Sequence, residues 1–428
     1  MFDKTFKPYL HVLSKRGFFL LWLSQIISQF GDRLTQMAII GLVYKRSGGV
    51  NALALTKIMF FVILPVLLIN PLAGVYVDRW DKRITMFVSD FLRGVIVLVL
   101  ALFMLRIKSM IPIYLTILLA SAAGRFFIPA KMSLVPNLTT KGDIYLANSL
   151  ISVTANVAAV FGLGLGGLIV ERWGPKGGFL IDAGTFFLSS LCVFLIPLPL
   201  KAHNLAQISK DVLKLSREIV EREKSLLNEF KEGIKYIVSH KDTVFSLKVF
   251  FILFSFLGSL YAVFIAFIQS QLHSATKDLG FLAIWLGMGL FVGSLVYGRI
   301  GDRFSASRSI YLMLFVDSLI LIMFALSLKY NPSRITASVF SFFLGSFASP
   351  ILVGANALIH KKSDGNFWGR IFSSLEVVMH FAFLLFMFLA SFLADKFGYF
   401  TIIVSTAIII AVFSASSFIK HNVRSSPL

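Results

Sequence analysis

Long apolar runs separated by short polar segments extend through almost the whole chain. A helix that crosses a membrane needs about 20 mostly apolar residues, and twelve runs reach that length. They lie roughly at residues 17–44, 52–77, 84–105, 110–133, 144–170, 177–198, 244–271, 279–299, 309–328, 335–358, 370–394 and 398–419. This pattern predicts an all-α membrane protein with twelve transmembrane helices.

One long polar stretch, residues 201–243, separates the sixth run from the seventh. Its apolar residues recur at steps of three and four between charged residues, which predicts an amphipathic helix on the membrane surface. We interpret this helix as a strap that joins two bundles; a regulatory or partner-binding helix is the alternative. The predicted domains are an N-terminal six-helix bundle (1–200), a cytoplasmic amphipathic linker (201–243) and a C-terminal six-helix bundle (244–428).

The composition excludes an ordinary soluble protein. Hydrophobic residues make up 57% of the chain and charged residues 14%, with a mean hydropathy of +0.83, whereas soluble domains carry about 25% charged residues. The net charge is +20, but the basic residues lie between apolar runs rather than on one face, so we expect no nucleic-acid partner. Of the 41 Lys and Arg residues, 26 fall on the side that holds both termini and 10 on the other. Basic loops stay in the cytoplasm, so we expect both termini there.

Several kinds of chemistry are not supported by the residues present. The single cysteine, Cys192, excludes an intrachain disulfide. The chain has no glycine-rich nucleotide loop, no His-Glu-x-x-His pair and no Cys/His cluster, so we expect no enzyme activity, no cofactor and no metal. We also expect no cleavable signal peptide, because the first apolar run is too long for one and leads into further runs.

Two related loops lie at equivalent positions in the two halves. Each reads as a glycine, three residues, Asp-Arg and then basic residues before the next run. The first copy holds Gly74, Asp78, Arg79, Lys82 and Arg83, and the second holds Gly298, Asp302 and Arg303. The Asp can accept backbone N–H bonds at a helix start, and the cations can pair with acids or helix C-termini. We predict that these loops form a conformational latch, supported by a pair between Asp90 and Arg93 in the third run.

At these loops the chain resembles the major facilitator superfamily, whose loop between spans 2 and 3 reads G-x-x-x-D-R-x-x-[RK]-R. The first copy matches every fixed position, and with the twelve runs and the central linker the resemblance covers essentially the whole chain. It implies two six-helix bundles related by pseudo-two-fold symmetry, with a central path that opens alternately to each side.

Four further stretches resemble the branch that holds macrolide-efflux and siderophore-export proteins, with lysophospholipid transporters nearby. They are Gly31-Asp32, Phe127–Lys131 with Leu146–Asn148, Phe179–Ala183 and Gly369–Ser373. Drug antiporters of the superfamily often carry Gly-Pro-x-x-Gly-Gly in span 5. Here the proline is missing, and the stretch holds Gly162, Gly164, Gly166 and Gly167. We expect these glycines to allow close helix packing.

Ionisable side chains inside apolar runs are energetically expensive and are candidate functional groups. Asp32, near the middle of the first run, is the main candidate for proton coupling, and a static ion pair with Arg33 is the alternative. Glu376 and His380 lie one helical turn apart and form a second candidate, either a proton relay or a polar pair near the interface.

Four other intramembrane charges receive simpler interpretations. Arg33 and Arg125 are candidate charges of a substrate cavity, where Arg125 would neutralise an acid or attract an anionic substrate. Asp182 and Asp317 are interpreted as structural.

The sequence therefore predicts a secondary active transporter, a proton-coupled exporter of amphipathic drugs or siderophore-like compounds. The alternatives are a lysophospholipid transporter and a non-transporting membrane receptor or scaffold. We expect its partners to be membrane lipids, a small amphipathic substrate and protons. We expect it to act as a monomer in a bacterial cytoplasmic (inner) membrane.

Overall fold

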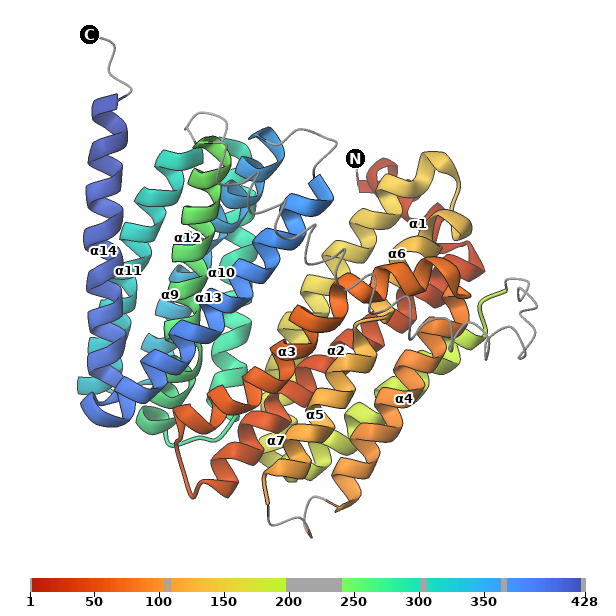
Figure 1. The fold of residues 1–428 in the computed structure, drawn as a ribbon, viewed down its shortest axis with the longest axis horizontal. Coiled ribbons are helices and arrows are strands. Elements are labelled where there is room, and N and C mark those ends of the chain that lie inside the picture. Colours follow the sequence, from red (N-terminus) through yellow and green to blue (C-terminus); the bar gives the residue numbers. More distant parts are fainter. Residues whose placement is uncertain are drawn as a thin grey trace. The chain divides into compact units, whose positions relative to one another are not determined.

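The computed structural model describes residues 2–103, 106, 109–197, 241–300, 306–362 and 368–424, and nearly all of them lie in helices (Figure 1). The first helices are α1 (Phe2–Leu13), α2 (Arg16–Arg46), α3 (Ala52–Arg79), α4 (Lys82–Phe103), α5 (Ile111–Gly124), α6 (Phe127–Leu138) and α7 (Ile144–Phe194), with a 3₁₀ turn η1 at Lys141–Asp143. The later ones are α9 (Lys241–Leu272), α10 (Lys277–Ile300), α11 (Ala306–Tyr330), α12 (Arg334–Lys362), α13 (Trp368–Phe397) and α14 (Tyr399–Arg424). The prediction of an all-α protein is confirmed. The linker helix predicted between the two halves falls on residues outside the described ranges, apart from the first residues of α9.

The helices coincide with the predicted apolar runs. Ten helices in the described part of the chain are long and apolar enough to cross a membrane. One of them, α7, is 51 residues long and covers the fifth and sixth runs. The first run is covered by α2, which is not among the ten because its Ser, Gln and charged residues lower its hydropathy. A count of twelve membrane crossings in two six-helix bundles stays a prediction.

The helical pattern is interrupted at two places, one between the fifth and sixth predicted runs and one inside the fourth. Gly174 has φ 71° and ψ 173°, in a region that glycine reaches without steric cost, and Pro175 follows it. This break divides α7 between the two runs that it covers. The fourth run is divided into α5 and α6 at Arg125 and Phe126, where the N–H of Arg125 bonds to the carbonyl of Ala122 in a tighter turn (3.2 Å).

The chain packs into two compact units, whose division does not follow the linker. Unit 1 comprises Met1–Ala38, Ile58–Gly162 and Pro175–Glu232, and unit 2 comprises Ile39–Lys57, Leu163–Gly174 and Gly233–Leu428. Two segments of the first half therefore belong to the unit that contains the second half. Both segments include loops that the charge pattern places outside the cell. The domain boundaries at residues 200 and 244 stay a prediction.

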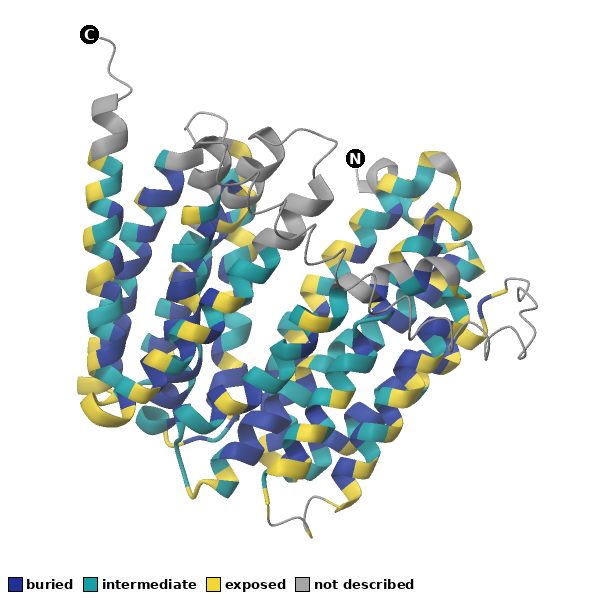
Figure 2. Ribbon diagram, in the orientation of Figure 1, coloured by how far each residue is buried: buried dark blue, intermediate teal, exposed yellow. Residues whose placement is uncertain are grey.

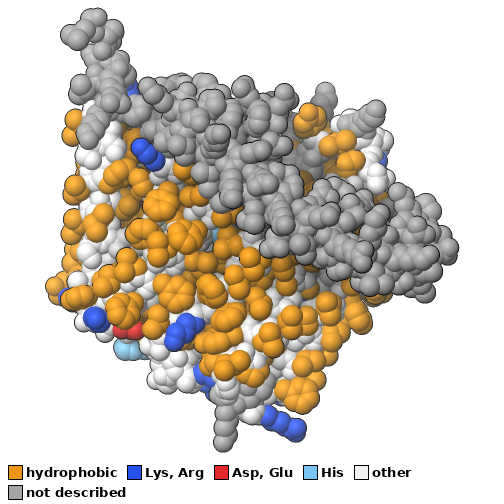
Figure 3. Space-filling model, viewed as in Figure 1, with side chains coloured by type: hydrophobic (Ala, Val, Ile, Leu, Met, Phe, Trp, Pro, Cys, Tyr) orange, Lys and Arg blue, Asp and Glu red, His pale blue; other side chains and the backbone are white. Residues whose placement is uncertain are grey.

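Several described helices bury polar side chains while large apolar side chains on the same helix are exposed. On α4, Asp90 and Ser89 are buried (0% and 4% exposed), while Val88, Phe91 and Val99 are 47–49% exposed. Buried and exposed positions alternate along the helices (Figure 2), and hydrophobic side chains cover much of the described part of the face in Figure 3. Apolar residues outside and polar residues inside are what a helix in lipid requires, because charges there must face the protein interior.

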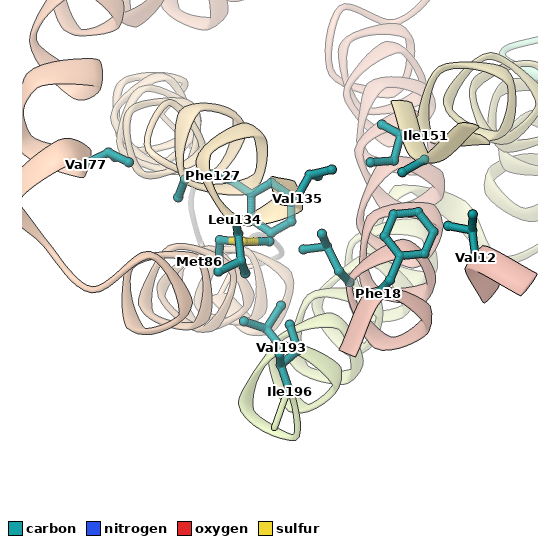
Figure 4. Close-up of a cluster of buried hydrophobic side chains, with 13 residues drawn as sticks. Val12, Phe18, Val77, Met86, Phe127, Leu134, Val135, Ile151, Val193 and Ile196 are labelled. Atoms are coloured by element: carbon teal, nitrogen blue, oxygen red, sulfur yellow. The ribbon is translucent and has the colours of Figure 1, made fainter. Parts of the chain in front are cut away.

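A cluster of buried apolar side chains joins the helices of unit 1 at one end (Figure 4). Its members are Val12, Phe18, Leu21, Val77, Met86, Phe127, Ala130, Leu134, Val135, Ala147, Ile151, Val193 and Ile196. They come from six helices and from the residues that follow α7. Lipid tails are as apolar as these side chains, so close van der Waals packing holds the cluster together rather than transfer out of water.

An ion pair outside the apolar runs joins the corner between α1 and α2 to the start of α7. Lys15 Nζ donates to Asp143 Oδ2 over 2.6 Å, and Thr140 Oγ1 donates to the same oxygen over 2.7 Å. The hydrogen bond from Lys15, followed by that from Thr140, lowers the pKa of the Asp143 carboxyl below its usual value.

This pair predicts a pH-dependent difference in stability. A carboxyl whose pKa is lower in the folded state stabilises the fold above its unfolded-state pKa, and the contribution is lost as pH falls through the folded-state value. We expect Asp143→Asn to have a lower Tm than the wild type at neutral pH, and the difference to shrink as pH drops below about 4. Thermal unfolding in detergent, followed from neutral pH to below about 4, measures the difference in Tm and its decrease with pH. A constant difference between the two proteins would contradict the assignment.

Candidate functional site

A network of charged side chains lies inside unit 1, between α2, α4 and α7. Arg93 on α4 is at its centre, with a side chain only 11% exposed. Its NH2 group forms an ion pair with Asp32 Oδ1 on α2, and its NH1 group lies 3.4 Å from Asp90 Oδ1. The guanidinium also covers the ring of Phe186 on α7, 4.0 Å from the ring centroid. One cation therefore connects three helices.

The carboxyl group of Asp90 is held by hydroxyl groups as well as by Arg93. Asp90 is fully buried. The hydroxyl of Ser189 on α7 lies 2.5 Å from Asp90 Oδ2, and that of Ser28 on α2 donates to Asp90 Oδ1 over 3.4 Å. Hydrogen bonds of this kind replace the water that a carboxyl group loses on burial.

A third carboxyl group, that of Asp182 on α7, contacts α2 near Asp32. It is fully buried and is contacted by the hydroxyls of Thr35, which donates to Oδ2, and of Thr185, 3.1 Å from Oδ1. Gly31 makes room for this contact, because a Cβ there would lie 2.2 Å from Asp182 Oδ1 and 2.0 Å from Thr185 Oγ1. Two of the stretches that carry the family resemblance, Gly31-Asp32 and Phe179–Ala183, meet at this point.

The ion-pair partner of Asp32 is Arg93, so the alternative of a static Asp32–Arg33 pair is wrong. Arg33 instead donates to Gln36 Oε1 over 3.2 Å. Adjacent residues of a helix point about 100° apart. Arg33, although next to Asp32 in the sequence, therefore points away from it. The expected pair of Asp90 and Arg93 is present, but Arg93 reaches beyond it to a second helix.

Sequence reasoning missed the hydroxyl groups of the network and gave Asp182 no role beyond structure. A signal was available on α2, where Ser24, Ser28, Asp32 and Thr35 follow one another at steps of four, four and three. This spacing places all four on one face of the helix. A polar face on an otherwise apolar helix predicts polar partners on the neighbouring helices.

Three of the other candidate charges, Glu376, His380 and Asp317, belong to unit 2. In unit 2, the ring Nδ1 of His380 lies 2.8 Å from the backbone carbonyl of Glu376, so the described contact of His380 is to the main chain. A relay between the two side chains stays a prediction. Arg125 lies at the end of α5, where its Nε donates to the carbonyl of Ser121 over 3.2 Å. Asp317 on α11 is buried, and its Oδ1 has no hydrogen-bond partner among the described residues.

Two cations of the predicted latch bind carbonyl groups at helix ends. Lys82 Nζ donates to the carbonyl of Val77 in the last turn of α3 (2.6 Å) and to that of Trp80 just after it (3.0 Å). Arg83 NH1 donates to the carbonyl of Ile196 (2.7 Å), which follows α7. The remaining latch positions are less informative. Asp302 and Arg303 lie outside the described residues, and so do the side-chain surroundings of Gly74, Asp78 and Arg79. A Cβ at Gly298 would meet no described atom within 4 Å.

The glycine stretch of α7 divides its contacts between the two units. In unit 1, a Cβ at Gly162 would lie 2.8 Å from Arg33 Cβ. In unit 2, a Cβ at Gly167 would lie 2.5 Å from the carbonyl oxygen of Thr276, and one at Gly164 would lie 2.4 Å from Ile284 Cδ1. Gly166 is buried. The segment Leu163–Gly174 thus packs backbone to backbone against the start of α10.

A carboxylate strengthens the same contact. Glu171 Oε2 accepts hydrogen bonds from the backbone N–H groups of Thr276 (2.9 Å) and Lys277 (3.2 Å), at the beginning of α10. The Thr276 hydroxyl donates to the carbonyl of Gly167 over 2.9 Å. The first N–H groups of a helix have no partner within it, and a negative charge there is stabilised by the helix dipole. Glu171 is therefore an N-terminal cap supplied by a distant part of the chain.

We expect Glu171→Ala to loosen this helix start. The amides of Thr276 and Lys277 would lose their acceptor, at a cost of about 0.5–2 kcal/mol for a lost helix cap. Hydrogen exchange of a peptide containing residues 274–280 should accelerate, while exchange in α4 should stay unchanged. Glu171→Gln keeps an acceptor oxygen and should show a smaller acceleration. Unchanged exchange in Glu171→Ala would show that the cap does not protect α10.

The network in unit 1 can bind and exchange protons, because it contains three carboxyl groups. Among the residues that the structure describes, no group of three or more His, Cys, Asp or Glu side chains is arranged to hold a metal ion. Cys192 is a free, buried thiol. The chemistry that these described side chains offer is acid–base and electrostatic.

Comparison of this sequence with known proteins identifies its family. The family model described as "Transmembrane secretion effector", of the major facilitator superfamily, matches residues 7–355. Macrolide efflux protein A of Streptococcus pyogenes is 21% identical over 90% of this chain and 91% of its own length. The putative bacilysin exporter BacE of Bacillus subtilis is 24% identical over 72% of each chain. The MFS-type transporter YfiS of the same organism is 26% identical, and that match spans about half of each protein (52% of this chain and 50% of YfiS).

Solved structures agree on the fold. A bacterial homologue of the iron transporter ferroportin, in an inward-facing state, superimposes with a TM-score of 0.69 over 95% of this chain and 98% of its own. The two sequences are only 14% identical, so this likeness concerns architecture alone. The chain belongs to the transmembrane secretion effector family of the major facilitator superfamily, and it is a multi-pass membrane transporter and not an enzyme.

Proposed function

We propose that the protein is a proton-coupled exporter of amphipathic small molecules that works by alternating access. The observation that carries this proposal is the ion pair between Asp32 and Arg93. The Asp32 side chain is 43% exposed, whereas its partner Arg93 is 11% exposed. A carboxylate with a partly exposed side chain, paired with a mostly buried cation, can take up a proton and release its partner.

Protonation of Asp32 changes the interactions between helices. A neutral Asp32 no longer attracts Arg93, which then keeps only Asp90 on its own helix as an ionic partner. The link between α2 and α4 weakens as a result. Because charges inside a membrane protein are costly unless paired, the loss of one partner favours a rearrangement that supplies another. This is how a proton can bias one conformation over the other.

The proposed substrate class is supported by the names of two relatives. One is named a macrolide efflux protein and another a putative bacilysin exporter. We therefore infer outward transport of an amphipathic drug-like or siderophore-like compound. We place the protein in a bacterial cytoplasmic membrane with both termini inside, and the Lys82 and Arg83 contacts support a latch role for that loop.

Transport in proteoliposomes tests the proposal. Purified protein is reconstituted, and accumulation of a macrolide, of bacilysin and of a lysophospholipid is measured with and without an imposed pH gradient. We expect uphill accumulation of a macrolide or bacilysin only with the gradient. Gradient-independent movement of lysophospholipid would favour the lipid-transporter alternative. No flux of any of the three would favour the receptor or scaffold alternative.

A further inference from the structure

Asp182 differs from the other two acids of the network in having no cation within hydrogen-bond distance among the described residues. Its polar contacts are the hydroxyls of Thr35 and Thr185. The charged groups near enough to act on it electrostatically are Asp32 on α2 and Arg93 on α4. Arg93 is already engaged by Asp32 and by Asp90.

The number of charges in the network does not balance. Three carboxyl groups share one guanidinium, so full ionisation would leave two negative charges in excess inside the membrane. A buried charge without a counterion is strongly disfavoured, and such a group becomes neutral instead. Asp182, fully buried and contacted only by hydroxyls, is the carboxyl group for which ionisation costs most.

The hydroxyl groups around Asp182 fit a protonated carboxyl group. Thr185 Oγ1 lies 2.7 Å from the backbone carbonyl of Asp182 and 3.1 Å from its Oδ1. A hydroxyl has one hydrogen but can also accept. When Thr185 donates to the carbonyl, it can accept the proton of Asp182 Oδ1, while Thr35 donates to Oδ2. Every polar atom of the group then has a partner.

Arg93 lies where a second carboxyl group can reach it. Its guanidinium covers the ring of Phe186, which is four residues after Asp182 on α7. Residues at this spacing are neighbours on one helix face. Arg93 therefore lies near Asp182 and acts on its carboxyl group electrostatically, while it contacts Asp32 directly.

We propose that Asp182 is a second proton-binding site, which holds a proton in this conformation and becomes the partner of Arg93 when Asp32 is protonated. The exchange conserves charge. Asp32 takes up one proton and loses its ion pair, Asp182 releases one proton as its O–H bond breaks, and the guanidinium moves between the two carboxyl groups. This proposal rests on the proposed proton-coupled function and adds the place from which the proton leaves.

Infrared difference spectroscopy of the protein in lipid vesicles at pH 7 tests the resting state. A protonated carboxylic acid has a C=O stretch that ionised carboxylates lack and that shifts in heavy water. We expect the spectrum of the wild type minus that of Asp182→Asn to contain this band. The spectrum of the wild type minus that of Asp32→Asn should contain it too, because an asparagine at position 32 mimics the protonated acid, and Asp182 then releases its proton and becomes the partner of Arg93. Absence of the band from the Asp182 difference would overturn the proposal.

Two further variants keep the test decisive. Thr35→Val retains the acid but removes one hydrogen-bond donor, so the band should persist at a higher frequency even if Asp182→Asn fails to fold. Asp317→Asn removes a buried acid on α11 in unit 2, and it should leave the Asp182 band in place. If the band vanishes in Asp317→Asn but not in Asp182→Asn, the proton belongs to Asp317, and the proposal is refuted.

The spectroscopic result is independent of transport. If the Asp182 band is present and flux does not respond to a pH gradient, the proton site stands and the coupled function fails. If flux responds to the gradient and the band is absent, coupling stands and Asp182 is not its second site.

Discussion

Replacing Asp32 with asparagine should reduce gradient-driven accumulation of substrate to the level of protein-free vesicles, while binding and downhill exchange persist. Asparagine resembles the protonated acid in shape and cannot ionise, so it holds the protein in the state that follows proton uptake. A proton gradient then has no group through which to act. A proton gradient acts on transport through a group whose protonation differs between the two conformations. Without a charged form of residue 32, the gradient can no longer favour one conformation over the other.

The variant should still fold, because Arg93 keeps Asp90 as a partner 3.4 Å away. Arg93→Met is the opposite case. It leaves Asp32 and Asp90 without their cation, and removing one partner of a buried pair costs about 3–5 kcal/mol. We expect Arg93→Met to be expressed at a lower level and to have a lower Tm than the wild type, whereas Asp32→Asn should match the wild type in both.

Flux and thermal unfolding, measured on the same preparations, decide between a switch and a static pair. Asp395→Asn, the same substitution at an exposed position of α13, is the control and should accumulate substrate normally. Wild-type accumulation by Asp32→Asn would end the coupling hypothesis and direct attention to Glu376 and His380. A large drop in Tm together with lost flux would assign Asp32 a structural role.

Gly167→Leu should abolish transport and lower the Tm. Its Cβ would lie 2.5 Å from the carbonyl oxygen of Thr276 and 2.9 Å from Gly280 Cα. Both are backbone atoms, so no side-chain rotation relieves the contact and the helices must separate. Overpacking typically costs about 1–3 kcal/mol, although leucine improves intrinsic helix propensity by about 1 kcal/mol relative to glycine. The sign of the stability change is therefore informative.

A matched control exists on the same helix. Gly184 is exposed, and a Cβ there would meet no described atom within 4 Å, so Gly184→Leu should transport normally. The contact at Gly167 joins a segment of the first half of the chain to the first turn of α10 in the second half. Alternating access requires such a contact to form and break. Transport by Gly167→Leu at the wild-type rate would show that this packing is not part of the cycle.

Much of the fold follows from hydropathy alone. The described parts of the predicted apolar runs are almost entirely helical, because a backbone in lipid must satisfy its own hydrogen bonds and an apolar segment of this length can do so only as a helix. The breaks at Gly174 and Arg125 differ in this respect. Gly174 with Pro175 is readable from residue type, whereas nothing in the apolar sequence around Arg125 indicates that the run divides there.

Partner choice in the site did not follow from sequence spacing. Asp32, Asp90 and Arg93 could each be identified as costly charges inside apolar runs, since hydropathy depends only on residue type and position. Asp32 pairs with Arg93 and not with Arg33. This choice depends on how α2 and α4 are rotated about their axes. Rotation is set by packing, as when Gly31 lets α2 approach Asp182 and Thr185.

The sequence by itself determined the membrane class, the helical runs, the repeat of the loops and the residues whose charge demands an explanation. Only the tertiary structure decided which of those charges meet, that Asp182 faces hydroxyls rather than a cation, and that Glu171 caps a helix start 105 residues away. The physical reason is that transfer into lipid is a property of each segment, whereas hydrogen bonds and ion pairs require groups from different segments to come within about 3 Å of one another.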